Sequence, residues 1–131
     1  MALVLCIGRE LALMETRRLI LEAAGHTVVP AMSIPQLEQA YSKHEFDVVV
    51  IGQGIPAKEK LRIFDLVRRI CPTSKVLELH TFPSEQLLKG ADDSLIVPAE
   101  IPSEFAQRVA TLAKRKTSPP KKRSRARRAN S

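Results

Sequence analysis

Short, uniformly hydrophobic runs alternate along the chain with longer segments in which hydrophobic residues recur every three or four positions. The clearest run is Val48–Ile51, four β-branched residues in succession, which ends at Gly52-Gln53-Gly54. A run without a polar face predicts a strand that is covered on both sides, as in the centre of a parallel sheet. In parallel sheets, ligands bind just beyond the carboxyl ends of such strands. A reactive side chain would therefore be expected at position 52, but the residue there is glycine, which has no side chain.

The rest of the chain continues this alternation. Five segments have the composition of strands, residues 2–7, 26–30, 48–51, 75–79 and 94–97. Four segments have the periodicity of amphipathic helices, residues 9–24, 34–42, 57–70 and 101–116, and residues 84–89 are expected to form a short, weak helix. Repeated strand–helix units with short links are typical of a doubly wound α/β fold with a five-stranded parallel sheet.

Local signals support several of these boundaries. Gly25 is suited to end the first helix, and Ser33 can cap the second. The third helix is expected to bury one hydrophobic side, made of Leu61, Phe64, Leu66, Val67 and Ile70.

The net charge of +7 is unevenly distributed. Nine of the 21 Lys and Arg residues, and none of the 14 Asp and Glu residues, lie within residues 114–131, so the preceding body is mildly acidic. The sequence TSPP at 117–120 breaks any helix, and no large hydrophobic residue follows it. We therefore expect one folded domain at residues 1–116 and a disordered basic tail at residues 117–131.

The two cysteines, Cys6 and Cys71, are expected to be buried free thiols. Without a signal peptide, this predicts a reducing, cytoplasmic compartment. No hydrophobic run approaches the roughly 18–20 residues that span a bilayer, so no membrane association is expected.

One motif resembles a known family. The segment GADDSLIVP at residues 90–98 resembles the GADDYLxKP segment of CheY-like response-regulator receiver domains. TRRLILEAAG at residues 16–25 is similar to the first helix of that family, and Pro56 matches its proline after the third strand. The resemblance covers roughly residues 2–115. It implies a flavodoxin-like, three-layer α/β/α fold with strand order 2-1-3-4-5. It also implies a cis peptide bond at Pro98, for which a trans proline that ends the strand is the alternative.

The phosphotransfer residues of that family are absent from the matching positions. Receivers hold Mg²⁺ with a pair of acids after the first strand, because hard divalent cations require oxygen ligands. The acidic pair falls on Gly8 and Arg9, the phosphoacceptor on Gly52, the switch Ser/Thr on His80, the switch aromatic residue on Ser94, and the lysine on Val97.

These substitutions predict a degenerate receiver that works by binding another protein, without aspartyl phosphorylation. The resemblance places the partner surface at residues 75–88 and 94–112, for a signalling protein or a second copy of the chain. We expect no enzyme activity, cofactor or metal site, because no carboxylate pair, Cys/His pair, serine nucleophile or phosphate-binding glycine loop is present.

Two residues leave alternatives open. Arg9 could replace the absent Mg²⁺ electrostatically, pairing with Glu10 or an anion, or it could be a solvated surface arginine. His80 could be a pH-sensitive or ligand-binding group, or a hydrogen-bonded loop histidine.

The basic C-terminal residues support an alternative function, nonspecific binding of DNA or RNA through phosphate contacts. A solvated tail is the other interpretation, since no zinc finger, recognition helix or aromatic stacking module accompanies it. The candidate contacts are Lys114, Arg115, Lys116, Lys121, Lys122, Arg123, Arg125, Arg127 and Arg128.

Overall fold

The structure is a computed structural model that describes residues 2–81, 88, 90–97 and 103–115. The strands in this part of the chain are β1 (Leu3–Ile7), β2 (Thr27–Ala31), β3 (Val48–Ile51), β4 (Lys75–His80) and β5 (Asp93–Ile96). The helices are α1 (Leu11–Ala23), α2 (Ile34–Tyr41), α3 (Ala57–Ile70) and α4 (Glu104–Lys114).

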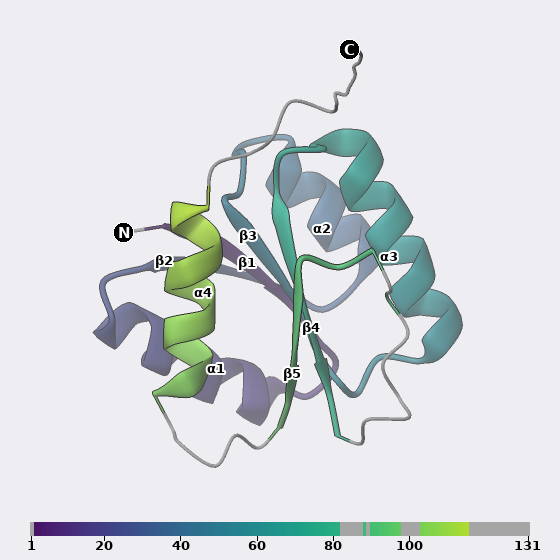
Figure 1. The fold of residues 1–131 in the computed structure, drawn as a ribbon. Helices are drawn as coiled ribbons and strands as arrows, with labels where there is room; N and C mark the ends of the chain where they lie inside the picture. The colour runs from purple at the N-terminus through teal and green to yellow at the C-terminus, as the bar shows by residue number, and fades with distance from the viewer. Residues whose placement is uncertain (1, 82–87, 89, 98–102, 116–131) are drawn as a thin grey trace.

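The five strands form one parallel sheet in the order β2-β1-β3-β4-β5. Helices α1 and α4 cover one face and α2 and α3 cover the other, which gives three layers (Figure 1). The predicted flavodoxin-like fold and its strand order are therefore confirmed. The parallel direction brings the carboxyl ends of all five strands to one edge of the sheet, which contains the candidate site.

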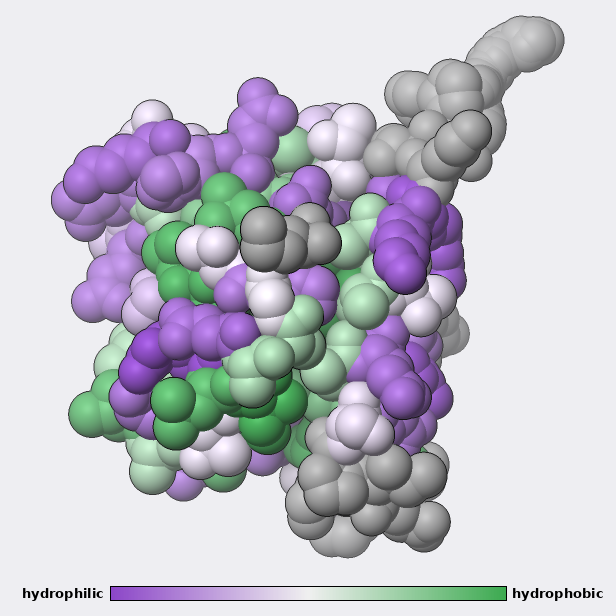
Figure 2. Space-filling view, turned by 90° about the vertical axis from the view of Figure 1, so that its left-hand side faces the viewer, coloured by the Kyte–Doolittle hydropathy of each residue, from purple (hydrophilic) through white to green (hydrophobic). Residues whose placement is uncertain are grey.

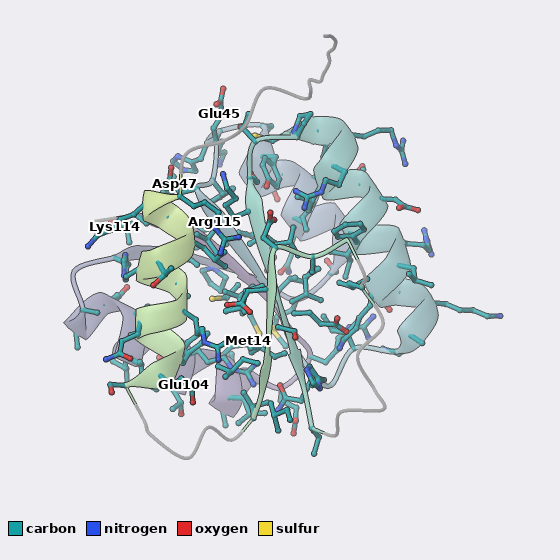
Figure 3. All side chains as sticks on the ribbon, in the orientation of Figure 1. Met14, Glu45, Asp47, Glu104, Lys114 and Arg115 are labelled. Atoms are coloured by element: carbon teal, nitrogen blue, oxygen red, sulfur yellow. The ribbon has the colours of Figure 1, made fainter. Side chains whose placement is uncertain are left out.

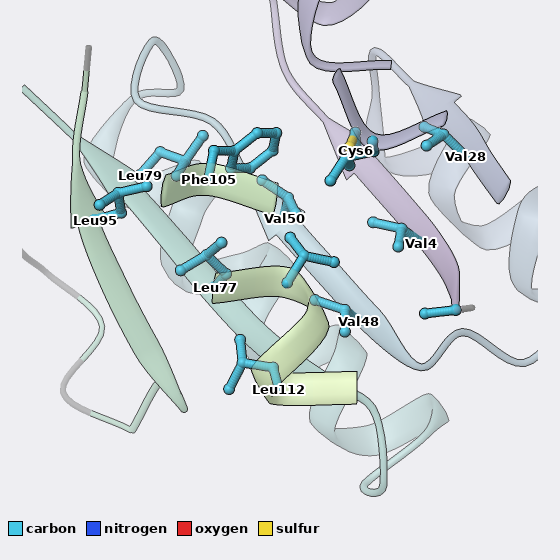
Figure 4. Close-up of a cluster of buried hydrophobic side chains, with 13 residues drawn as sticks. Val4, Cys6, Val28, Val48, Val50, Leu77, Leu79, Leu95, Phe105 and Leu112 are labelled. Atoms are coloured by element: carbon cyan, nitrogen blue, oxygen red, sulfur yellow. The ribbon is translucent and has the colours of Figure 1, made fainter. Parts of the chain in front are cut away.

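The central strand explains why a uniformly hydrophobic run was needed. Successive side chains of a strand point to opposite faces. Val48 and Val50 pack with α1 and α4 in one core cluster (Figure 4), whereas Val49 and Ile51 pack with α2 and α3 in the other. All four residues of β3 are buried, so a polar residue at any of them would lose contact with water.

The predicted helix signals are confirmed at two positions. Gly25 has a φ of 94°, a left-handed conformation that favours glycine, directly after the end of α1. The hydroxyl of Ser33 accepts a hydrogen bond of 3.3 Å from the backbone N–H of Gln36 at the start of α2.

Hydrophobic residues of two helices are exposed, and the predicted buried face of α3 was partly wrong. Leu11 and Leu19 of α1 are 66% and 59% exposed, and Figure 2 shows hydrophobic and hydrophilic side chains intermixed on the side that carries α1 and α4. Leu61 and Ile70 of α3 are also exposed. Helix α3 instead turns the stripe Lys60, Ile63 and Val67 toward the sheet, so its buried face includes a lysine that hydrophobicity alone assigns to solvent.

The edge strand β5 is held by an arginine from each helical layer. Arg68 of α3 donates to the Asp92 carboxylate at 2.9 Å and to the carbonyl of Gly90 at 3.2 Å. Arg108 of α4 donates to both carboxylate oxygens of Asp93, at 3.0 and 3.1 Å. The two acids of the GADD segment therefore anchor β5 from opposite faces.

Some predictions lie outside the described residues. These are the weak helix at 84–89, of which only Leu88 is described, the cis peptide bond at Pro98, and the tail from residue 116 onward. Among the helices that the structure does describe, none has both the length and the hydrophobicity to cross a bilayer.

Candidate functional site

The candidate site lies where β1 and β3 end side by side. Gly8 follows β1 and Gly52 follows β3, and the backbone N–H of Gly52 donates to the Ile7 carbonyl at 2.9 Å. A Cβ atom placed on Gly52 would lie 3.6 Å from the Cα of Gly8. The structure therefore brings these two sequence-predicted positions together. Their correspondence to the acidic and phosphoacceptor positions of receivers remains a prediction from the resemblance.

Two side chains of α1 occupy the space above these glycines. A Cβ on Gly8 would lie 3.3 Å from Cγ of Met14, which is buried. A Cβ on Gly52 would lie 3.2 Å from Nη1 of Arg17 and 3.2 Å from the Ile7 carbonyl oxygen. Both separations are tighter than ordinary van der Waals contact, so the missing side chains at Gly8 and Gly52 allow Met14 and Arg17 to pack there.

Arg17 is a residue of this candidate site that sequence reasoning missed. Its guanidinium donates a hydrogen bond to the side-chain oxygen of Gln53, the residue after Gly52. Burial lowers the pKa of Arg17, while Cys6 and Glu10 act in the opposite direction. Burial also raises the pKa of the Cys6 thiol to about 12, so this thiol is neutral at pH 7. Arg17 therefore places a positive charge beside Gly52.

Arg9 does not have the predicted partner. Its guanidinium forms an ion pair with Glu59 in the first turn of α3, not with Glu10, and its side chain is 43% exposed. Glu10 lies just before α1, with its Oε1 3.8 Å from the place of a Cβ on Gly54. The Arg9–Glu59 pair is partly exposed, so water screens it and its contribution to stability is small.

These residues do not fit a magnesium ion. Mg²⁺ requires near-octahedral oxygen coordination, usually with one or two carboxylates. Gly8 and Gly52 supply no side-chain oxygen, and Arg17 presents a cation at Gly52. Within the described residues, no group of three or more His, Cys, Asp or Glu side chains is placed to hold a metal ion.

The remaining predicted positions lie on the neighbouring strands. His80 is the last residue of β4 and is only 4% exposed, so the expectation of a loop histidine was wrong. Its carbonyl accepts a hydrogen bond of 2.9 Å from the N–H of Val97. Ser94 lies in β5, and its carbonyl accepts from Arg108 at 3.0 Å. His80 and Val97 thus join β4 to the end of β5.

A buried ion pair lies beneath α3, and sequence reasoning missed it too. Nζ of Lys60 donates to Oε2 of Glu78 at 3.1 Å and to the carbonyl of Leu79 at 2.9 Å. The other carboxylate oxygen of Glu78 accepts from the backbone N–H of Leu88 at 2.9 Å. A glutamate inside the otherwise hydrophobic run VLEL was the available signal.

The described part of the basic segment begins at the opposite end of the molecule. Figure 3 shows Lys114 and Arg115 near Glu45 and Asp47, away from Glu104 at the start of α4. Asp47 precedes β3, so this end holds the amino ends of the strands. Arg115, Glu45 and Asp47 line the same small hollow. The other seven candidate contacts, from Lys116 to Arg128, lie outside the described residues.

No protein-family model and no curated protein matches the sequence. Solved structures match along most of its length. A response regulator receiver domain protein from Clostridium thermocellum has a TM-score of 0.74 at 20% identity, covering 86% of this chain and 94% of that chain. A chemotaxis response regulator of Vibrio cholerae has a TM-score of 0.72 at 21% identity, covering 86% and 98%.

The response regulator protein TrrA from Thermotoga maritima, solved in complex with Mg²⁺ and BeF, has a TM-score of 0.72 at 17% identity, covering 86% of this chain and 99% of that chain. At these identities the likeness establishes the fold. The chain has the fold of CheY-like response-regulator receiver domains.

Proposed function

We propose that this protein is a non-catalytic signalling module with a receiver fold, which acts by binding another protein without aspartyl phosphorylation. The observation that carries the proposal is the pair of glycines at the ends of β1 and β3, with Arg17 against Gly52. Covalent phosphorylation of a receiver needs a carboxylate oxygen as nucleophile. Gly52 supplies no such atom, and no metal-binding group of His, Cys, Asp or Glu side chains lies in the part of the chain that the structure describes.

The proposed partner surface is the face formed by β4, β5 and α4. Its boundaries, residues 75–88 and 94–112, come from the resemblance, and residues 82–87 and 98–102 lie outside the described part. The strand β5 is at an edge of the sheet, and Ile96 is 45% exposed there. An edge strand with an exposed hydrophobic residue is suited to contact a signalling protein or a second copy of the chain. Occupancy of this face, rather than a phosphate switch, would carry the signal.

Incubation with acetyl phosphate and Mg²⁺ is expected to leave residues 46–56 unmodified, because Gly52 lacks a nucleophile. Intact-protein mass spectrometry under neutral conditions, followed by peptide mapping, measures this directly. A receiver that retains its phosphoacceptor aspartate, treated in the same tube, is the positive control. An acid-labile phosphoryl adduct on the 46–56 peptide would contradict the proposal.

The charge distribution supports nonspecific binding of nucleic acid through the C-terminal segment as a second candidate function. Nine basic residues and no acid lie within residues 114–131. The described start of this segment, Lys114 and Arg115, lies at the end of the molecule opposite Gly52. The segment could therefore contact a polyanion without covering the candidate site.

Removing residues 117–131 tests this second function, since six of the nine basic residues lie there. If the tail binds phosphates, the full chain retards DNA in a gel shift, and the truncated chain loses the binding. Affinity should fall roughly 10³-fold or more between 50 and 200 mM salt if at least six phosphates are contacted. A co-purifying protein retained by the truncated chain favours the signalling module instead. Equal retardation of DNA by both chains excludes the tail as the contact.

A further inference from the structure

We infer that Arg17 is the resident cation of this site, and that it takes the electrostatic place of the divalent metal in receivers that carry the acidic residues. The inference rests on the proposed function and deepens it. It concerns which positive charge occupies the site. It predicts that an acid introduced at position 52 forms an ion pair with Arg17 and binds Mg²⁺ only when Arg17 is replaced.

The first step is steric. Arg17 lies one helical turn after Met14 on α1, so both side chains lie on the same side of the helix. Met14 packs against Gly8 and Arg17 against Gly52. Neither glycine needs an unusual backbone conformation, since Gly25 is the described glycine with a positive φ. What Gly8 and Gly52 provide is space, and α1 fills it with one hydrophobic and one cationic side chain.

The second step concerns charge. An arginine guanidinium keeps its charge at all ordinary pH values, even when it is partly buried. The hydrogen-bond partner of Arg17 is the neutral amide of Gln53, and the nearby Cys6 thiol is uncharged at pH 7. Glu10 is the carboxylate that acts on Arg17 at longer range. Among the described residues no carboxylate lies within ion-pair distance of Arg17.

The third step is the consequence for metal binding. A cation held beside Gly52 attracts a carboxylate introduced there and repels Mg²⁺. The positive charge at the site is therefore permanent, because it belongs to a side chain of the protein and not to a bound ion that can dissociate. Magnesium and phosphoryl donors should leave the protein and its partner binding unchanged.

A double-mutant cycle in the full chain tests the inference. The Gly52→Asp and Gly52→Asn variants add side chains of nearly equal size, so they share the steric cost against the Ile7 carbonyl and differ in charge. With Arg17 present, the melting temperature of Gly52→Asp should exceed that of Gly52→Asn by about 4 °C or more. In the Arg17→Met background the order should reverse, because the carboxylate then lacks its cation.

Magnesium titration adds a second measurement. Millimolar Mg²⁺ should raise the melting temperature of Gly52→Asp only when Arg17 is replaced by methionine. If Gly52→Asp and Gly52→Asn keep the same order in both backgrounds, or if Mg²⁺ shifts Gly52→Asp equally in both, Arg17 is not the resident cation.

A further variant covers the case in which position 52 tolerates no side chain. Gln53→Glu replaces an amide that already accepts from Arg17 with a carboxylate of the same shape. Its melting temperature should rise with Arg17 present and should not rise in the Arg17→Met background. A rise of equal size in both backgrounds overturns the inference. None of these outcomes depends on the acetyl phosphate experiment, which tests the proposed function in the native chain.

Discussion

Replacing Glu78 by alanine is expected to lower the free energy of unfolding by about 3–5 kcal/mol, because it leaves a buried ammonium without its counterion. The side chains of Lys60 and Glu78 are 3% and 0% exposed, and their charged atoms lie 3.1 Å apart. The substitution also removes the acceptor of the Leu88 N–H. Urea unfolding followed by circular dichroism measures the loss.

Two further variants separate the ion pair from simple loss of packing. The double variant Lys60→Met/Glu78→Leu removes both charges, and it should recover most of the stability that Glu78→Ala loses. Glu15→Ala breaks an exposed pair with Arg18 on α1 and should change stability by less than about 1 kcal/mol. A loss of under about 1 kcal/mol for Glu78→Ala would show that water or another group binds the Lys60 ammonium in the variant. That result would contradict the prediction that this ammonium is left buried without a partner.

The Lys60–Glu78 pair also bears on the proposed partner surface. It connects α3, β4 and Leu88, which belongs to the connection from β4 to β5. A carboxylate with both oxygens bonded to protein groups holds these three parts in one arrangement. If residues 75–88 contribute to the interface, the Glu78→Ala variant should therefore bind the partner more weakly and should also be less stable.

Replacing Asp92 by alanine is expected to lower the free energy of unfolding by about 2–3 kcal/mol. Its carboxylate accepts from the backbone N–H of Val76 at 2.7 Å and from Arg68 at 2.9 Å. Alanine leaves a partly buried N–H of β4 without an acceptor and removes the ion pair with Arg68, although the bond from Arg68 to the Gly90 carbonyl remains. Chemical denaturation gives the change, and hydrogen exchange should show faster exchange in β5.

Asp93→Ala is the matched control for Asp92→Ala, because the two acids are adjacent and each accepts from an arginine and from one backbone N–H, which for Asp93 is that of its neighbour Ser94 at 2.8 Å. Arg108 would keep its bonds to Glu104 and to the Ser94 carbonyl, both at 3.0 Å. The expected loss is about 1 kcal/mol or less, since this pair is about one-third exposed. Equal losses for both variants would show that the N–H of buried Val76 contributes no more than the N–H of the more exposed Ser94.

The succession of strands and helices along the chain was predictable because its signals are local, whereas the order of the strands within the sheet was implied by the resemblance. A strand that is covered on both faces must be hydrophobic at every position, and β3 shows this directly in its sequence. Gly25 and Ser33 mark the helix ends that their backbone and side-chain chemistry favour. The predictions for Gly25 and Ser33 agree with the structure because a positive φ and a helix N-cap depend on the residue at that position and not on residues far away in the sequence.

The helix faces were less predictable. Leu11 and Leu19 continue the hydrophobic pattern of α1, yet they are exposed, since the direction in which the helix packs decides which of several hydrophobic positions faces the sheet. Lys60 shows the opposite error, a charged residue on the buried stripe of α3. Its burial depends on Glu78, which is 18 residues away in the sequence.

The candidate site divides in the same way. The absence of acids at Gly8 and Gly52 is visible in the sequence, because it concerns which atoms each residue has. That Met14 and Arg17 fill the space above these glycines could not be seen, since Arg17 belongs to a stretch of charged residues that otherwise read as the solvent side of α1.

The sequence by itself determined the order of strands and helices along the chain and the lack of a nucleophilic side chain at the end of β3. Local composition is sufficient for the first, and the covalent structure of glycine is sufficient for the second. Only the tertiary structure decided which charges are buried, which pair with each other, and that a cation lies beside Gly52. Those outcomes depend on distances between residues that are far apart along the chain, and such distances exist only once the layers have packed.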